Sequence, residues 1–463
     1  MSRTRHKQGP LPAQLRHINL NAAGIDIGGE SHWVAVPEGR DPEGRTVREF
    51  GCFTADLFAL ADWLVQCGIT TVAMESTGVY WIPLFEILDR RGIHVALVNP
   101  RHLKTVPGRK SDVLDCQWIQ QLHTYGLLQG SFRPHDQICV LRGYLRQRAM
   151  LVRYASHHIQ HMQKALDQMN LKLHRVVTDI TGVTGMGIIR AILAGKRNPL
   201  ILAQLRDPRC KNTTETIAKA LEGNWREEHL FSLRQAVALF DAYQDQLRTC
   251  DAQTAAYLST FVSRTEDPPP ANPGRKTPRI RNEPGFDAKS HLYRICGVDL
   301  TRIDGIHTHT ALKLISEVGL DMTRWPTVKH FTSWLGLCPG SKISGGKVLN
   351  SRTKPSSNRA AAAFRLAANG LHNSQSALGA FLRRKKAHSG SPKAVTATAH
   401  KLARLFYSML KHGNEYQDPG MDDYQNRYQA RVISNLRKKA AAFGFSLTEN
   451  EHLDQTPCPA ASG

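Results

Sequence analysis

The sequence lacks any uninterrupted apolar run of about eighteen residues, the length needed to cross a bilayer as a helix. Its first residues, MSRTRHKQGPLPAQLRH, carry charge but no apolar core of a signal peptide. The nine cysteines include no C-x-x-C pair and no zinc-finger spacing, which argues against a disulfide framework and a structural zinc site. We therefore expect a protein of the reducing cytoplasm that is neither exported nor inserted in a membrane.

Acidic residues are absent from one long stretch. Residues 322–414 contain no Asp or Glu but sixteen Lys and Arg, although the overall acid frequency predicts about eight acids there. The whole chain has a formal net charge of +22 and a pI of about 9.8. A surface of one sign at this density favours a polyanionic partner, most simply nucleic acid.

The N-terminal part predicts a mixed α/β fold. AAGIDIGG, SHWVAVPEG and VREFGCFT are strand-like runs separated by turn residues, and they predict an antiparallel meander. A helix, the strand TTVAMES, a second helix and the strand HVALVNP follow. At 463 residues the chain is too long for one core, so further domains are expected after this one.

Four acids fall at strand ends and on a neighbouring helix. Asp26 lies in the first strand, Glu75 ends the fourth, and Asp112 and Asp115 share one face of the helix that follows Ser111, an expected N-cap. A solvated first helical turn or ordinary salt bridges would explain each acid alone. Together, oxygen-only ligands suit Mg²⁺ or Mn²⁺, ions that assist displacement at phosphate.

A second group surrounds a serine near the other end. In FTSWLGLCPGSKISGGKVLNSRTKPSSN, Ser344 precedes two glycines, where backbone can approach a ligand closely. A serine in such a turn is ordinarily only a turn residue. Five nearby cations are candidate nucleic-acid contacts: Lys342, Lys347, Arg352, Lys354 and Arg359. Four other serines are rivals: Ser341, Ser351, Ser356 and Ser357.

The ordered motifs GIDIG, AMESTGVYW and GRKSDVLDCQW, followed by WLGLCPGSKISGG, resemble a family of bacterial insertion-sequence transposases. The resemblance implies a RuvC-like, RNase H-type domain whose DEDD tetrad is Asp26, Glu75, Asp112 and Asp115. It also implies that Ser344 is the nucleophile of a C-terminal transposase domain. Members are similar to serine recombinases in chemistry and are understood to use a non-coding bridge RNA that pairs with donor and target DNA. A homodimer or tetramer, working at the bacterial nucleoid, is expected on the same grounds.

The remainder reads as mainly helical. His135 to Val177 predicts one continuous helix for an antiparallel hairpin or a coiled-coil dimer. Two Gly-containing turns, at 180–195 and 303–319, resemble helix-hairpin-helix elements or plain helical corners. The expected organisation is an N-terminal basic arm (1–22), a RuvC-like domain (23–130), a helical coiled coil (131–179), a helical insertion (180–264), a Pro/Arg-rich linker (265–290), a basic serine transposase domain with a helix-hairpin-helix (291–413) and a tail (414–463).

Three functions remain open from the residues. The first is DNA recombination in which Ser344 attacks a phosphodiester with the help of metal held by the tetrad. The second is a metal-dependent junction-resolving nuclease in which the tetrad activates water and Ser344 only contacts phosphate. The third is a non-catalytic nucleic-acid-binding protein whose acids are salt-bridge partners.

Overall fold

The computed structural model describes residues 19–100, 112–270 and 282–448. The chain divides into two compact units, Met1–Arg133 and Pro134–Gly463. No helix in the described ranges is both long and apolar enough to cross a membrane. Ser111, the expected N-cap, lies outside the described residues.

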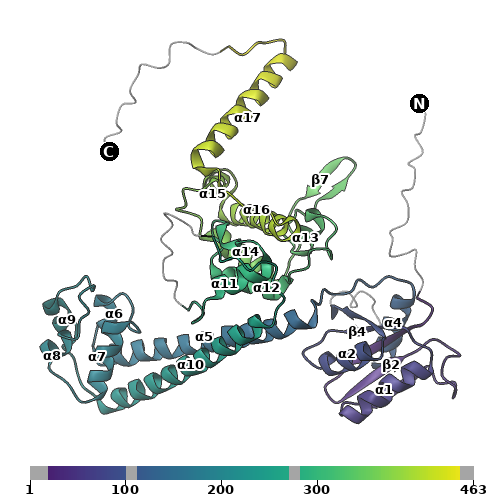
Figure 1. Cartoon of the computed structure of the whole chain (residues 1–463), viewed down its shortest axis with the longest axis horizontal. Coiled ribbons are helices and arrows are strands. Elements are labelled where there is room, and N and C mark those ends of the chain that lie inside the picture. Colours follow the sequence, from purple (N-terminus) through teal and green to yellow (C-terminus); the bar gives the residue numbers. More distant parts are fainter. Residues whose placement is uncertain (1–18, 101–111, 271–281, 449–463) are drawn as a thin grey trace. The chain divides into compact units, whose positions relative to one another are not determined.

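The first unit is a five-stranded mixed sheet with helices on both faces (Figure 1). Its strands, in the spatial order β3-β2-β1-β4-β5, are β1 (Ala22–Ile27), β2 (Ser31–Ala35), β3 (Val47–Gly51), β4 (Thr71–Glu75) and β5 (His94–Val98). The first three are antiparallel, and β4 and β5 run parallel to β1. The predicted RNase H-like fold with a mixed sheet is confirmed.

The two faces of this sheet, formed by alternating residues of its strands, pack on different helices. One face packs on α1 (Thr54–Gln66) and α2 (Trp81–Arg90) through residues such as Ile25 and Met74. The other face packs on α4 (Asp112–Thr124), where Ala73 and Ile119 are buried together. Side chains along a strand point alternately to the two faces. Even-numbered positions of β1 and odd-numbered positions of β4 therefore face α4.

The second unit begins with a long helical pair. α5 (Asp136–Gln168) packs along α10 (Glu227–Ser259), and four short helices lie between them in sequence: α6 (Leu173–Val176), α7 (Val183–Leu193), α8 (Pro199–Ala203) and α9 (Thr214–Ala220). Tyr144 contacts Tyr257, while Tyr154 contacts Tyr243, so the two long helices are antiparallel (Figure 1). The partner of the long helix is thus in the same chain.

The prediction of one continuous helix from His135 to Val177 was wrong. α5 ends at Gln168, and Asn170 adopts a left-handed backbone with φ of 58°. Asparagine tolerates that conformation better than most residues, which allows it to end a helix. The chain then turns before the single helical turn of α6.

The rest of the second unit is a helical domain with one β-hairpin. Its elements are α11 (Ala288–Cys296), the 3₁₀ helix η2 (Leu300–Arg302), α12 (Thr308–Val318), α13 (Val328–Trp334), β6 (Lys342–Ser344), β7 (Lys347–Asn350), α14 (Arg359–Asn369), α15 (Ala377–Ser389), α16 (Ser391–His412) and α17 (Gly420–Ala442). Phe331, Phe364 and Phe406 are fully buried and in ring contact at its core. None of the residues of α17 is buried.

The two Gly-containing turns each lead directly into a helix, α7 and α12. In the second, Gly305 has φ of +85°, and a Cβ there would lie 2.7 Å from the carbonyl oxygen of Ala367 on α14. This turn therefore packs against α14 as a close helical corner. A phosphate contact at either turn stays a prediction.

Candidate active-site residues

Asp26 and Glu75 occupy neighbouring positions at the same end of two parallel strands. The register pairs Ile25 of β1 with Met74 of β4, and the two acids are the next residue of each strand. Both point to the α4 face, because Ile25 and Met74 point to the opposite one. Both side chains are half-buried.

α4 brings its first turn to this end of β1. A Cβ at Gly24 would lie 2.2 Å from the backbone nitrogen of Gln120 and 2.4 Å from the carbonyl oxygen of Cys116, so helix and strand touch directly. Further along the helix, His123 Nε2 lies 2.9 Å from Thr71 Oγ1 at the start of β4, so α4 runs antiparallel to β1 and β4. Moving two residues along a strand or four residues along a helix covers about the same distance, roughly 6 Å. Asp26 therefore faces the helical turn that contains Asp112 and Asp115.

The four acids act on one another electrostatically. The pKa of Asp26 is raised from 3.8 to about 6, first by burial and then by the negative charges of Glu75, Asp115 and Asp112. The Cys116 thiol beside them has a pKa raised to about 12, mainly by burial and next by the charge of Asp26. Like charges held together in this way disfavour ionisation unless a cation is also present.

The donor set suits a hard divalent cation. Among the described residues, no Lys, Arg or His forms an ion pair with Asp26, Glu75, Asp112 or Asp115. Within the described residues, the Thr77 hydroxyl donates a hydrogen bond to Glu75, and the backbone N–H of Ile27 donates one to Asp26. In the same described ranges, no three His, Cys, Asp or Glu side chains stand close enough to enclose a metal ion. The acids are gathered but do not form a closed coordination shell, and all available ligands are carboxylate oxygens.

The raised pKa of Asp26 gives a stability test in the absence of metal. Because its folded pKa of about 6 exceeds 3.8, the folded state binds the extra proton between these values, and stability from this group falls as pH rises through that window. We expect the unfolding midpoint of the metal-free wild type, relative to Asp26→Asn, to drop between pH 4 and pH 7. Urea unfolding of both proteins in chelator measures this difference.

Added Mg²⁺ should restore wild-type stability at pH 7 more than at pH 5, because only the ionised carboxylate attracts the cation. Asp26→Asn should show a smaller Mg²⁺ effect. An identical pH profile in the two proteins would contradict the placement of Asp26 among the three other acids.

Gly24 and Cys116 were not singled out in the sequence. The only available signal for Gly24 is a glycine inside a strand, which often marks a close approach of another backbone. Here that approach is by α4, and it decides where Asp112 and Asp115 lie.

Ser344 is the last residue of β6 and directly precedes the hairpin turn. Gly345 and Gly346 have φ of 54° and 76°, which two-residue turns of the type I′ class require at both central positions. Ser344 pairs with Lys347 across the turn, and Pro339 and Gly340 join Thr353 and Arg352 at the base. Every residue of β6 and β7 is exposed. The hairpin thus presents Ser344 to solvent.

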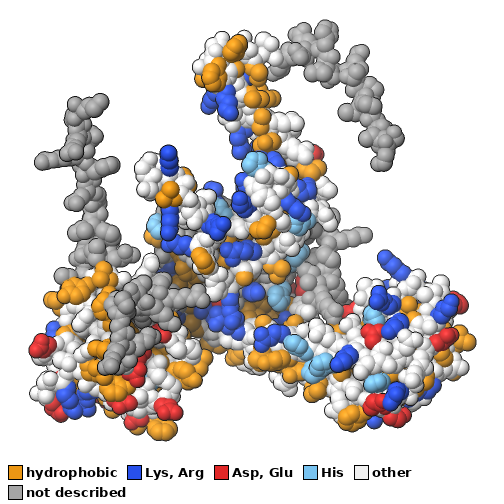
Figure 2. All heavy atoms as spheres, turned by 180° about the vertical axis from the view of Figure 1, so that it is seen from behind, with side chains coloured by type: hydrophobic (Ala, Val, Ile, Leu, Met, Phe, Trp, Pro, Cys, Tyr) orange, Lys and Arg blue, Asp and Glu red, His pale blue; other side chains and the backbone are white. Residues whose placement is uncertain are grey.

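The predicted nucleic-acid contacts cluster around this hairpin. All five are exposed, and none forms an ion pair with an acid of the described chain: Lys342, Lys347, Arg352, Lys354 and Arg359. In Figure 2, blue side chains are frequent over the C-terminal helical part, whereas red ones are scarce. Such cations are free to meet phosphates.

Exposure alone does not distinguish the rival serines, because Ser341, Ser351, Ser356 and Ser357 are exposed as well. Their settings differ. Ser356 Oγ accepts a hydrogen bond from the backbone nitrogen of Asn358, 3.1 Å away, just before α14. Among the five, Ser344 is the one next to the glycine turn.

Comparison with known proteins places these two sets of residues in one family. A transposase model for the IS110-type DEDD domain matches residues 23–171, which contain the four acids. A model described as "Transposase IS116/IS110/IS902 family" matches residues 298–378, which contain Ser344. No curated protein matches the chain. With the RNase H-like sheet and its clustered acids, the two matches show that the chain belongs to the IS110 family of transposases, enzymes that process DNA.

Proposed function

We propose that the protein is an RNA-guided DNA recombinase whose nucleophile is Ser344 and whose acids hold Mg²⁺ or Mn²⁺. The observation that carries this proposal is the position of Ser344 on an exposed hairpin among unpaired cations. Phosphates can reach such a hairpin without displacing other protein contacts.

Ser344 Oγ attacks the phosphorus of a scissile phosphodiester. The Oγ–P bond forms as the serine hydroxyl gives up its proton, and the bond from phosphorus to one sugar oxygen breaks. That oxygen takes up a proton and leaves as a hydroxyl, so the proton moves overall from serine to the leaving group. Rejoining is the reverse attack by a hydroxyl of another DNA end, which releases the serine. The covalent link keeps the ester bond energy, so no external energy source is needed.

The four acids, Asp26, Glu75, Asp112 and Asp115, would hold the divalent cation. When bound, the cation supplies charge neutralisation at the phosphate and lowers the cost of ionising a hydroxyl. Lys342, Lys347, Arg352, Lys354 and Arg359 hold the DNA backbone near Ser344.

Exchange between two duplexes cuts four strands, whereas each chain carries one Ser344. We therefore propose that a homodimer or tetramer acts, and that it works on DNA at the nucleoid in the bacterial cytoplasm. The bridge RNA pairs with donor and target DNA, so that base pairing selects the sites and the protein reads backbone.

A reconstitution experiment tests this function. The protein is purified with the co-expressed non-coding RNA of its element and incubated with defined donor and target DNA and Mg²⁺. We expect recombinant junctions whose positions change when the RNA's pairing loops are replaced. Binding should also weaken steeply with salt, because the chain carries a net charge of +22. Site choice that is unchanged after loop replacement contradicts guidance by RNA.

A metal-dependent junction-resolving nuclease is the second candidate. The gathering of four acids on an RNase H-like sheet favours it, since such a set can activate water without a serine. In that case DNA is cut without a protein–DNA adduct.

A further inference from the structure

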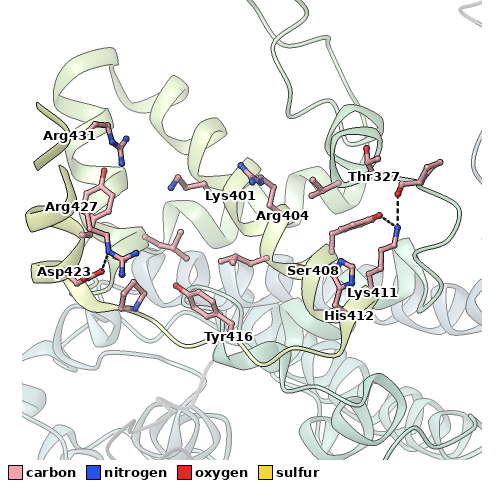
Figure 3. A pocket seen from close by; sticks show the side chains of 18 residues that line it. Thr327, Lys401, Arg404, Ser408, Lys411, His412, Tyr416, Asp423, Arg427 and Arg431 are labelled. Atoms are coloured by element: carbon pink, nitrogen blue, oxygen red, sulfur yellow. Dashed lines mark hydrogen bonds and ion pairs between the residues drawn. The ribbon is translucent and has the colours of Figure 1, made fainter. Parts of the chain in front are cut away.

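A pocket of about 760 Å³ lies between α16 and α17 in the second unit (Figure 3). α13 and α15 close its other sides through residues at their first turns. Most of its lining residues lie beyond residue 378, outside both segments that the transposase models match. The lining includes neither the four acids nor Ser344.

Cations from two helices line this pocket. Lys401 and Arg404 are three residues apart on α16, and Arg427 and Arg431 are four apart on α17, so each pair shares a helix face (Figure 3). Arg427 Nε lies 2.9 Å from Asp423 Oδ2, and Asp423 is the single acid of the lining.

Lys401, Arg404 and Arg431 have no such counter-charge among the described residues. Within the described ranges, no hydrogen bond or ion pair engages Arg404 or Arg431, and the Lys401 ammonium lies over the Phe381 ring at 4.3 Å. The pKa of Lys401 is lowered by burial first, and then by Arg404, Arg431 and Arg384. Like charges gathered at a half-buried position destabilise the protein unless an anion binds there.

Aromatic residues add a second kind of contact. Tyr407, Tyr416 and Tyr424 line the pocket. Tyr416 is half-buried, and its hydroxyl lies 3.2 Å from Asp418 Oδ1, which holds the ring at the wall shown in Figure 3. Sites for single-stranded nucleic acid commonly combine cations that contact the backbone phosphates with aromatic side chains on which the bases stack.

The volume of the pocket limits the size of the ligand that can enter it. Its volume falls in the range of about 300–1,000 Å³ typical of small-molecule sites. That space admits one or two unstacked nucleotides, whereas a base-paired duplex is too wide to enter.

We propose that this pocket binds a single-stranded segment of nucleic acid, with backbone phosphates on Lys401, Arg404 and Arg431 and a base against Tyr416. An unpaired stretch of RNA and a displaced DNA strand share this chemistry, and the two sources are separated by experiment. The site goes beyond the proposed function, because it requires neither Ser344 nor the four acids.

The test compares two full-length double variants with the wild type. Arg404→Ala/Arg431→Ala removes two pocket cations. Lys438→Ala/Lys439→Ala removes two exposed cations of α17 that do not line the pocket. Fluorescence anisotropy measures binding to RNA and DNA single strands of about 12 nucleotides and to a duplex of equal length.

We expect the pocket variant to bind at least one class of single strand about ten-fold more weakly. Its salt dependence for that strand should be shallower by about 1.4 log units per log unit, since two single-strand contacts are lost. The control variant and the duplex should change less than about two-fold. Ultraviolet cross-linking of 5-iodouracil strands should label a peptide containing Tyr416 in the wild type and not in the pocket variant.

Loss confined to RNA assigns the pocket to an RNA strand, loss confined to DNA assigns it to an unpaired DNA strand, and either supports the site. Equal binding by the two double variants, or cross-links only outside the pocket, overturns it. Because Arg404 and Arg431 are exposed and carry like charge, the unfolding midpoint of the pocket variant should be equal to or above that of the wild type, and the control variant should match the wild type. Failure of this test leaves strand exchange by Ser344 untouched, because adduct formation is measured separately.

Discussion

Ser344→Ala is expected to abolish both strand cleavage and the covalent protein–DNA adduct, a loss of more than about a thousand-fold. The substitution removes the oxygen that is proposed to bond to phosphorus, and no neighbouring group is placed to replace it at the turn. Since Ser344 is exposed and its side chain makes no hydrogen bond within the described part of the chain, the hairpin and complex assembly should survive. Denaturing gels with end-labelled DNA detect the adduct, and peptide mapping identifies the attached residue.

The rival serines provide matched controls. Each is exposed, and each is changed to Ala in its own variant: Ser341, Ser351, Ser356 and Ser357. Each should lose at most a phosphate hydrogen bond, worth about 0.5–3 kcal/mol in binding. Ser344→Cys should keep at most a trace of adduct, because sulfur is nucleophilic but displaced by its longer bond.

A full-strength adduct in Ser344→Ala, or an adduct mapped to another serine, refutes the assignment. Cleavage by the wild type without any adduct would instead favour the junction-resolving nuclease. Assembly with RNA and DNA should be checked in the same samples, so that a failure to bind is not read as a failure of chemistry.

The first domain could be predicted from local pattern because its elements follow one another in space. The meander, the parallel strands and the helices between them all have clear periodicity, and Asp26 and Glu75 sit at strand ends as expected. The sequence predicted one shared face for Asp112 and Asp115. What it did not show is which strand that face meets. That depends on packing between distant segments, here the contact of Gly24 with Cys116 and Gln120.

Three features of the second unit were beyond local pattern for different reasons. The end of α5 depends on the left-handed Asn170, and many asparagines lie within helices without ending them. The strands β6 and β7 are fully exposed on both faces, so no alternation of apolar and polar residues marks them. Only the Gly345-Gly346 pair is a hairpin signal. The cationic pocket needs α16 and α17 side by side, which no local sequence pattern reveals.

Asp115→Asn and Asp112→Asn are each expected to reduce DNA exchange by about 100-fold or more, with RNA binding within about two-fold of the wild type. Loss of one carboxylate from a shared site misplaces the metal, while the basic surface that binds RNA is unchanged. Glu86→Gln is the control. It removes one exposed charge from α2, whose helix packs on the opposite face of the sheet. Recombination in the reconstituted system and RNA anisotropy supply the two readouts.

Measurements of protein stability distinguish a metal-binding role of Asp112 and Asp115 from that of ordinary acids at a helix N-terminus. If Asp112 and Asp115 only complement the helix dipole, each Asn variant should lose about 0.3–1 kcal/mol of stability and keep its activity. If they share a site with Asp26 and Glu75, removing one negative charge relieves repulsion, and the metal-free protein should become no less stable. Asp26 should then also ionise at a lower pH in Asp115→Asn, because one of the charges that raise its pKa is gone. Full recombination with reduced stability in both variants would establish the helix-terminus role instead.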